Sequence, residues 1–93
     1  MKKYEFTVIL FPTDEMKEKG LEIIKSRFGK SGVEITKQED LGLRTLAYPI
    51  KKQDKGHYVY YEMEADPQSI NQMSDEFLLE GSILKFLFVA SKN

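Results

Sequence analysis

The run from Leu41 to Ile50 constrains the fold more than any other stretch of this 93-residue chain. It reads Leu-Gly-Leu-Arg-Thr-Leu-Ala-Tyr-Pro-Ile, which is apolar enough for a β-strand but places Arg44 in the middle and Pro49 near the end. Proline lacks a backbone N–H, so it is excluded from the middle of a sheet. We therefore expect an edge strand. An edge strand leaves backbone hydrogen-bonding groups unpaired. Charged residues or proline must prevent another chain from pairing with these groups, or a partner must cover them.

Alternating or continuous apolar patterns on either side of this run predict three further strands. Residues 3–11 alternate, and the side chains that we expect to face the core are Tyr4, Phe6, Val8 and Leu10. The strand that contains the central run spans residues 33–52, which is long enough that we expect a bend or bulge near Gly42. A turn at residues 53–56 and strands at residues 57–64 and 83–90 follow.

Two helices separate these strands. The first is predicted to begin after Pro12-Thr13 and to end near Gly29 and Gly32, with an apolar face made by Met16, Leu21, Ile24 and Phe28. Gly20 lies inside this helix, where glycine costs about 1 kcal/mol relative to alanine. The second helix is predicted to begin at Pro67, behind the capping residue Asp66, with Gly81 as its stop.

The resulting order, βαββαβ, is typical of a ferredoxin-like sandwich in the α+β class. We expect residues 1–93 to form a single domain with a four-stranded antiparallel sheet and both helices on one face. The first and third strands would then be central, which places Thr7 and Ile9 beside Tyr58 and Tyr60 on the open face. Such aromatic residues can stack on the bases of single-stranded RNA, but they can equally stabilise the sheet or form a protein interface.

Residues suited to catalysis or metal binding are scarce. The chain has no cysteine, and His57 is its only histidine, so we expect no catalytic residues, no metal site and no cofactor. Gly29-Lys30-Ser31 resembles the end of a phosphate-binding loop, but it follows a helix and lacks the preceding glycine. No apolar run approaches 18 residues, so we expect an intracellular protein without a membrane span.

Charge is distributed unevenly although the formal net charge is only −1. Residues 41–61 contain four basic residues and one acid, whereas residues 62–80 contain six acids and no basic residue. If the chain ends and the predicted hairpin meet in space, a basic patch forms opposite an acidic helix. These basic side chains could contact RNA phosphates, or they could simply guard an exposed edge. The set comprises Lys2, Lys3, Arg44, Lys51, Lys52, Lys55, Lys85 and Lys92.

Two motifs resemble the bacterial small-subunit ribosomal protein six family. They are Lys2-Lys3-Tyr4-Glu5 at the start, and the run from Leu41 to Ile50 with the following Lys51-Lys52. The resemblance covers essentially the whole chain. It implies a ferredoxin-like structural protein in the cytoplasm, not an enzyme, that binds the central domain of 16S ribosomal RNA together with small-subunit ribosomal protein eighteen during 30S assembly.

The resemblance also suggests sites. It places Lys2 and Lys3 against RNA, and we infer a docking surface for the partner protein in the second strand, at Leu41, Leu43, Leu46 and Tyr48. An alternative from a different functional class remains open. It is a ferredoxin-like regulatory module that dimerises through its open face and binds a small ligand.

Overall fold

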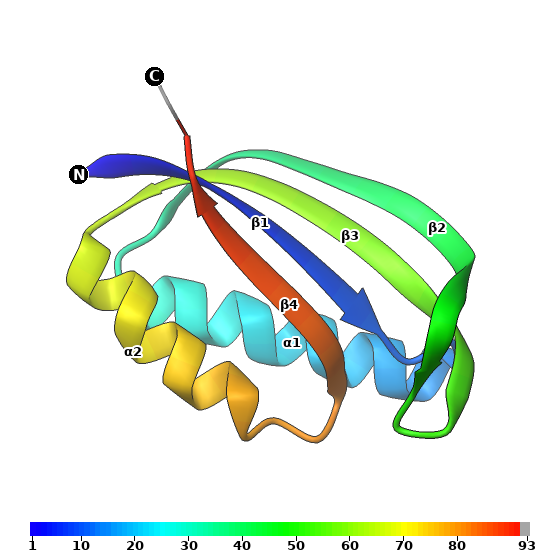
Figure 1. The fold of residues 1–93 in the computed structure, drawn as a ribbon. Coiled ribbons are helices and arrows are strands. Elements are labelled where there is room, and N and C mark those ends of the chain that lie inside the picture. Colours follow the sequence, from blue (N-terminus) through cyan, green and yellow to red (C-terminus); the bar gives the residue numbers. More distant parts are fainter. Residues whose placement is uncertain (92–93) are drawn as a thin grey trace.

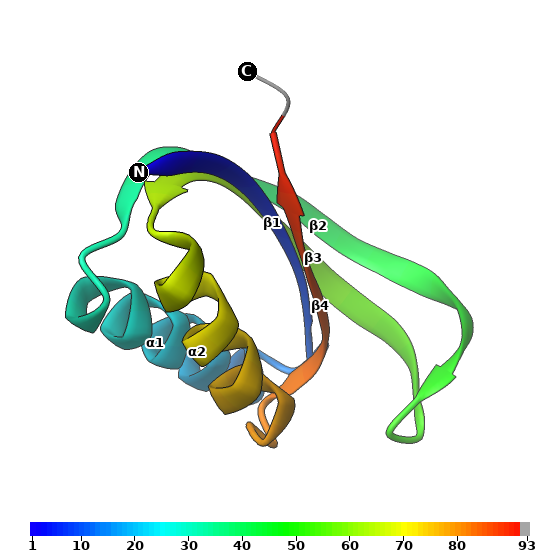
Figure 2. The same cartoon turned by 60° about the vertical axis from the view of Figure 1, so that its left-hand side comes forward.

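The computed structural model, which describes residues 1–91, confirms the predicted element order (Figure 1). The elements are β1 (Lys2–Leu10), α1 (Asp14–Lys30), β2 (Glu34–Ile50), β3 (Gln53–Ala65), α2 (Pro67–Leu78) and β4 (Ile83–Ala90). The strands form one antiparallel sheet in the order β2-β3-β1-β4, so β2 is an edge strand as Pro49 predicted. Both helices cover one face of this sheet and leave the other open, which confirms the ferredoxin-like α+β fold (Figure 2).

The main core lies between the sheet and the two helices. The predicted core side chains of β1 are all buried there: Tyr4, Phe6, Val8 and Leu10. The ring of Phe6 packs against aromatic residues from both helices and from β4, with centroid distances of 5.5 Å to Phe28, 5.6 Å to Phe77 and 4.4 Å to Phe88. Burial of this aromatic cluster fixes both helices on the same face.

Gly20 is buried in α1 for a steric reason. A β-carbon at this position would lie 2.7 Å from Cδ2 of Leu10 and 3.2 Å from the carbonyl oxygen of Ser82. The helix can therefore approach β1 closely only because this side chain is absent, which offsets the intrinsic cost of glycine in a helix.

The second helix ends earlier than expected. The sequence suggested Gly81 as its stop, but α2 ends at Leu78. The N–H groups of Leu79 and Glu80 donate to carbonyl oxygens three residues back, at 3.2 Å and 3.1 Å, which tightens the last turn and closes the helix.

The predicted bend in β2 lies at Gly42. This residue has a φ of +84°, and the register against β3 shifts between Asp40 and Gly42. The N–H of Gly42 donates to Oδ1 of Asp40 at 2.9 Å, which fixes the bend locally. Beyond it the paired β2 and β3 curve together toward the end of the sheet that holds the start of β4 (Figure 1).

The hairpin turn lies at Lys51 and Lys52, and the prediction of a turn at residues 53–56 is wrong. Ile50 pairs with Gln53, and Gly56 pairs with Arg44 inside the ladder. Gly56 is needed there because a β-carbon would collide with Cγ2 of Ile9 and would lie 3.4 Å from Leu46. The glycine that suggested a turn instead permits close packing within a strand.

This close packing forms a second, smaller cluster on the otherwise open face. Its buried members are Ile9, Leu46 and Leu84, with Phe11, Ile50 and Tyr58 partly buried around them. The cluster joins the curved hairpin to β1 and β4, so the hairpin tip is part of the packed fold.

Candidate nucleic-acid interface

The predicted basic residues form two separate groups. Five lie at the hairpin end of the sheet and are called here the hairpin-tip basic group: Arg44, Lys51, Lys52, Lys55 and Lys85. Lys2 and Lys3 lie at the opposite end, at the start of β1. The remaining candidate, Lys92, lies outside the described residues.

The start of β1 and the end of β4 meet each other but do not meet the hairpin tip. Lys3 pairs with Glu64, and its carbonyl oxygen accepts a hydrogen bond of 2.9 Å from the N–H of Ser91. From there β1 carries the chain roughly 25 Å along the sheet before it reaches the hairpin end. The basic residues therefore do not join in one patch. The acidic residues of segment 62–80 do not all lie on one helix either, because Glu62 and Glu64 lie on β3.

The turn of the hairpin presents two lysines in an uncommon backbone conformation. Lys51 has a φ of +49° and Lys52 a φ of +65°. Two-residue hairpin turns with positive φ at both positions favour Asn-Gly, because glycine has no β-carbon and asparagine tolerates this region better than other residues with a β-carbon. Lysine is an unfavourable residue for both of these backbone conformations, but the two lysines place two positive charges at the tip of the hairpin.

Lys51 and Lys85 also attach the hairpin tip to the rest of the fold. Nζ of Lys51 donates to the carbonyl oxygen of Ile83 at 2.8 Å. Nζ of Lys85 donates to the hydroxyl of Tyr48 at 3.2 Å and lies 5.8 Å from the centre of the Tyr48 ring. These contacts connect β2 to the start of β4 and hold the cations in defined positions.

Arg44 lies over an aromatic ring on the open face. Its guanidinium carbon is 5.6 Å from the centre of the Tyr58 ring, and its Nε donates to the carbonyl oxygen of Leu41 at 3.3 Å. Tyr58 also packs in the second cluster. The ring that the sequence offered for base stacking thus supports an arginine. Neither this contact nor the one between Tyr48 and Lys85 was foreseen, because no local pattern pairs these side chains.

The other open-face tyrosine is held by carboxylates. The hydroxyl of Tyr60 lies 2.7 Å from Oε1 of Glu5 and 3.0 Å from Oε2 of Glu62. The hydrogen bond to Glu5, followed by desolvation and the hydrogen bond to Glu62, raises the pKa of Tyr60 above its ordinary value. Two carboxylates beside this ring repel phosphate, so base stacking on Tyr60 is disfavoured.

The predicted docking residues of β2 differ in exposure. Leu43 and Tyr48 are 54% and 58% exposed, and Leu41 is half-buried. Leu46 is only 8% exposed because it packs against Ile9 and Leu84. Leu46 therefore holds the fold together, while Leu43 and Tyr48 offer apolar surface to solvent.

The lone histidine supports the bend of β2. Nε2 of His57 lies 2.6 Å from Oδ1 of Asp40. The pKa of Asp40 is lowered, first by the hydrogen bond from the N–H of Gly42, against partial desolvation, and further by His57. These polar contacts stabilise the bend where β2 changes register.

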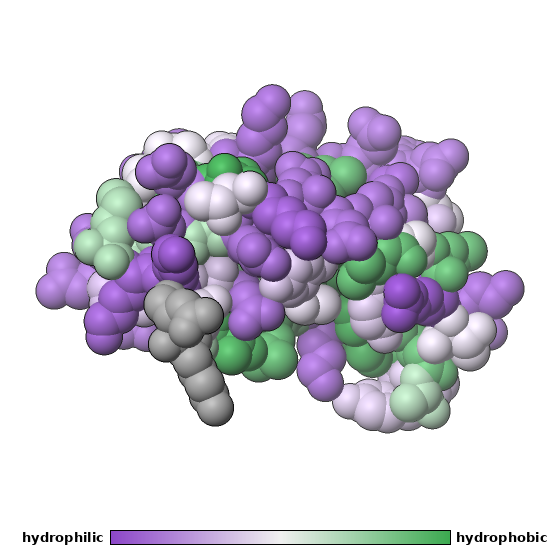
Figure 3. All heavy atoms as spheres, turned by 90° about the horizontal axis from the view of Figure 1, so that it is seen from above, coloured by the Kyte–Doolittle hydropathy of each residue, from purple (hydrophilic) through white to green (hydrophobic). Residues whose placement is uncertain are grey.

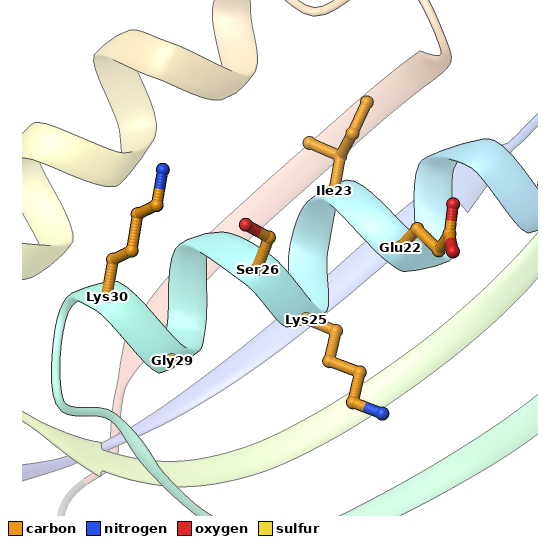
Figure 4. Close-up of a pocket in the computed structure, with 6 residues that line it drawn as sticks. All are labelled: Glu22, Ile23, Lys25, Ser26, Gly29 and Lys30. Carbon is orange, nitrogen blue, oxygen red and sulfur yellow. The ribbon is translucent and has the colours of Figure 1, made fainter.

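Hollows on the described residues include one of about 350 Å³ between α1, β2 and β3, with Leu21, Ile35 and Tyr61 in its lining. Another follows α1, and all six residues that line it come from that helix: Glu22, Ile23, Lys25, Ser26, Gly29 and Lys30 (Figure 4). A small-molecule site usually encloses its ligand between several elements, which a single helix cannot do. Within residues 1–91 no group of three or more potential metal ligands is present, and no helix is long and apolar enough to cross a membrane.

Comparisons with known proteins agree with one another. The sequence model of the family described as Ribosomal protein S6 matches residues 3–90. The small ribosomal subunit protein bS6 of Treponema denticola is 35% identical over 89 residues, which cover 96% of each chain. The bS6 protein of Thermus thermophilus is 31% identical over 94 residues, which cover 99% of this chain and 93% of that one.

Solved structures give the same result. The crystal structure of 30S ribosomal protein S6 from Thermotoga maritima matches with a TM-score of 0.85 and 25% identity, over 97% of this chain and 87% of that one. The C-terminal domain of the MgtC protein from Mycobacterium tuberculosis has a TM-score of 0.67 but only 13% identity, so it shows the fold alone.

Proposed function

The chain belongs to the ribosomal protein S6 family, and from this membership we propose its function. The proposal is a single cytoplasmic domain that takes part in 30S assembly. It binds the central domain of 16S ribosomal RNA together with small-subunit ribosomal protein eighteen. At the coarser level, the chain is a structural constituent of the small ribosomal subunit and not an enzyme. The observation that carries the proposal is the family match over residues 3–90.

The hairpin-tip basic group is the proposed RNA surface. Positive φ angles at Lys51 and Lys52 impose strain that Asn-Gly would avoid, so turn geometry alone does not account for lysine there. Arg44 and Lys85 are held in place by tyrosine rings, which lowers the entropy lost when each cation meets a phosphate. Lys55 extends the group along β3, and Lys2 and Lys3 provide a second contact at the far end.

The charge balance supports a need for a partner. A chain with a net charge of −1 has little general attraction for a polyanion, so local phosphate contacts must act against the repulsion from its own acids. We expect weak RNA binding by the isolated protein and tight binding when protein eighteen supplies additional positive charge. Leu41, Leu43 and Tyr48 are one candidate surface for that partner.

The test is RNA binding to a central-domain fragment, with and without protein eighteen, over a salt series. In the presence of protein eighteen, the double substitution Lys52→Gln and Lys55→Gln should lower the affinity and reduce the slope of log K against log salt by about 1 to 2. The matched control is Lys25→Gln with Lys30→Gln, which removes two exposed lysines from α1.

Two outcomes contradict the proposal. One is the absence of RNA binding by both proteins together while circular dichroism shows an intact fold. The other is tight, salt-insensitive binding of RNA by the isolated chain. Equal effects of the two double substitutions would show that overall charge, and not the hairpin tip, determines the affinity.

The alternative of a regulatory module that dimerises and binds a small ligand has no comparable support. The second cluster fills part of the open face through which such a dimer would form.

A further inference from the structure

The two edges of the sheet are protected very differently. The outer strand β2 carries alternating charges at Glu34, Lys37 and Glu39, a bulge at Gly42, and Pro49. These features discourage pairing with another strand. The opposite edge strand, β4, reads Ile-Leu-Lys-Phe-Leu-Phe-Val-Ala, without proline or glycine and with Lys85 as its only charge. An apolar edge of this kind favours the addition of a further strand.

Only part of β4 is free to accept a strand. Its start is attached to the hairpin tip through the contacts of Ile83 with Lys51 and of Lys85 with Tyr48. Beyond that point, residues 86–90 have β1 on one side and no described strand on the other. Leu87 and Val89 on this segment are 60% and 45% exposed, on the face away from the helices. Residues 86–90 are therefore an open edge with apolar side chains beside it.

A row of carboxylates without basic partners begins next to these apolar side chains and continues across the sheet. Glu5 is the neighbour of Val89 on β1 and is directly opposite Glu62 on β3, while Glu64 is directly opposite Glu34 on β2. Like charges opposite each other destabilise a sheet. Among residues 1–91, no lysine or arginine nitrogen lies within 4.0 Å of these four carboxylates.

The nearest positions that carry positive charge do not remove this repulsion. Lys3 pairs with Glu64 and Lys37 with Glu62 in the register, but the ion pair of Lys37 is with Glu39, at 3.9 Å. The single hydroxyl proton of Tyr60 is shared between Glu5 and Glu62, which fixes their positions without neutralising them. Figure 3 looks onto this face, where hydrophilic side chains cover the centre and hydrophobic ones form patches toward its margins.

We infer that residues 86–90 of β4, with the side chains of Leu87 and Val89 and the adjoining carboxylates of Glu5 and Glu62, dock an extended basic segment of a partner protein that adds a fifth strand to the sheet. The strand pairs with the open backbone edge, its apolar side chains cover Leu87 and Val89, and its lysines or arginines neutralise the carboxylates. RNA is disfavoured along residues 86–90, because its phosphates would meet the carboxylates of Glu5 and Glu62. The proposed RNA contacts of Lys2 and Lys3 lie before Glu5 on β1.

This inference rests on the proposed function, because it takes protein eighteen as the binding probe. Affinity is measured by calorimetry for three single variants. Leu87→Lys places a charge on the open edge, Leu79→Lys is a control at a 90% exposed position after α2, and Leu43→Lys tests the rival surface on β2. We expect Leu87→Lys to weaken binding at least about tenfold, because it prevents burial of one leucine, and Leu79→Lys to leave it within about twofold.

Charge is tested by a pair of double substitutions. Glu5→Gln with Glu62→Gln should weaken binding about tenfold and reduce its salt dependence, whereas Glu18→Gln with Glu22→Gln on α1 should do neither. Amide hydrogen exchange of the wild-type complex should show new protection at residues 86–90. Circular dichroism of each variant confirms that the fold is intact.

The outcomes separate this inference from the proposed function. If protein eighteen binds the wild type and Leu87→Lys equally well, or if only Leu43→Lys weakens binding, the partner docks elsewhere and the inference alone fails. If the wild type does not bind protein eighteen at all, both proposals fail. Loss of RNA binding by Leu87→Lys in the absence of protein eighteen would assign the edge to RNA and would overturn the inference.

Discussion

Leu46 and Leu43 lie three residues apart on β2, and truncating each to alanine should have very different costs. Leu46 is 8% exposed in the second cluster, whereas Leu43 is 54% exposed. At about 0.8 kcal/mol per buried methylene, removing three carbons from a nearly buried leucine costs roughly 2–3 kcal/mol, and any cavity left behind adds to this. The same change at Leu43 should cost roughly 1 kcal/mol, because only about half of that side chain is shielded from water.

Urea denaturation followed by far-ultraviolet circular dichroism measures both free energies of unfolding, which suits a chain without tryptophan. For a domain of this size, Leu46→Ala should also lower Tm by roughly 10–20 °C. Equal costs at the two positions, within about 0.5 kcal/mol, would show that the hairpin tip does not pack on Ile9 and Leu84, and would refute the account of the second cluster. An unchanged m value is needed for the comparison to be valid.

Two further predictions concern packing and ionisation. In urea denaturation, Gly56→Ala should destabilise the fold by about 1–3 kcal/mol, because the new β-carbon would contact Ile9. Gly29→Ala is the control: it has open space around it and should be neutral or slightly stabilising. Similar effects at both positions would contradict the close approach of Gly56 to Ile9. Burial raises the pKa of Tyr61 from 10.0 to about 12, so the stability that its neutral form provides is complete below pH 10 and is lost as the pH rises through about 12. Tyr61→Phe should therefore lose less stability than the wild type over that interval, and parallel losses would count against the burial of this phenol.

Features set by local patterns could be predicted from the sequence. Alternation placed Tyr4, Phe6, Val8 and Leu10 on one side of β1, and the structure buries all four. The missing N–H of Pro49 predicted an edge strand, and the excessive length of β2 predicted the bend at Gly42. Each of these inferences needs only the chemistry of a residue and of its neighbours along the chain.

Features set by contacts between distant residues could not be predicted. Gly56 resembles a turn glycine until Ile9, which is 47 positions earlier in the chain, is known to lie against it. Leu46 and Leu43 are the same residue type on the same strand, and their spacing of three places them on opposite faces. The curvature of the hairpin decides which of these faces is packed. The basic residues likewise looked like one set, because the register that separates Lys3 from Lys51 is not visible in composition.

That separation gives the low net charge a physical meaning. The hairpin-tip basic group lies at one end of the sheet, where Asp54 is the acidic residue of β3. At the other end the carboxylates of Glu5, Glu34, Glu62 and Glu64 outnumber Lys2, Lys3 and Lys37, so the two ends differ in charge. Because the two ends lie roughly 25 Å apart, more than a Debye length at physiological salt, each retains its own local potential. Under the two proposals, a polyanion at the hairpin tip and a basic protein segment on β4 can bind together without competing. A uniformly basic surface would attract RNA more strongly but would repel the basic partner.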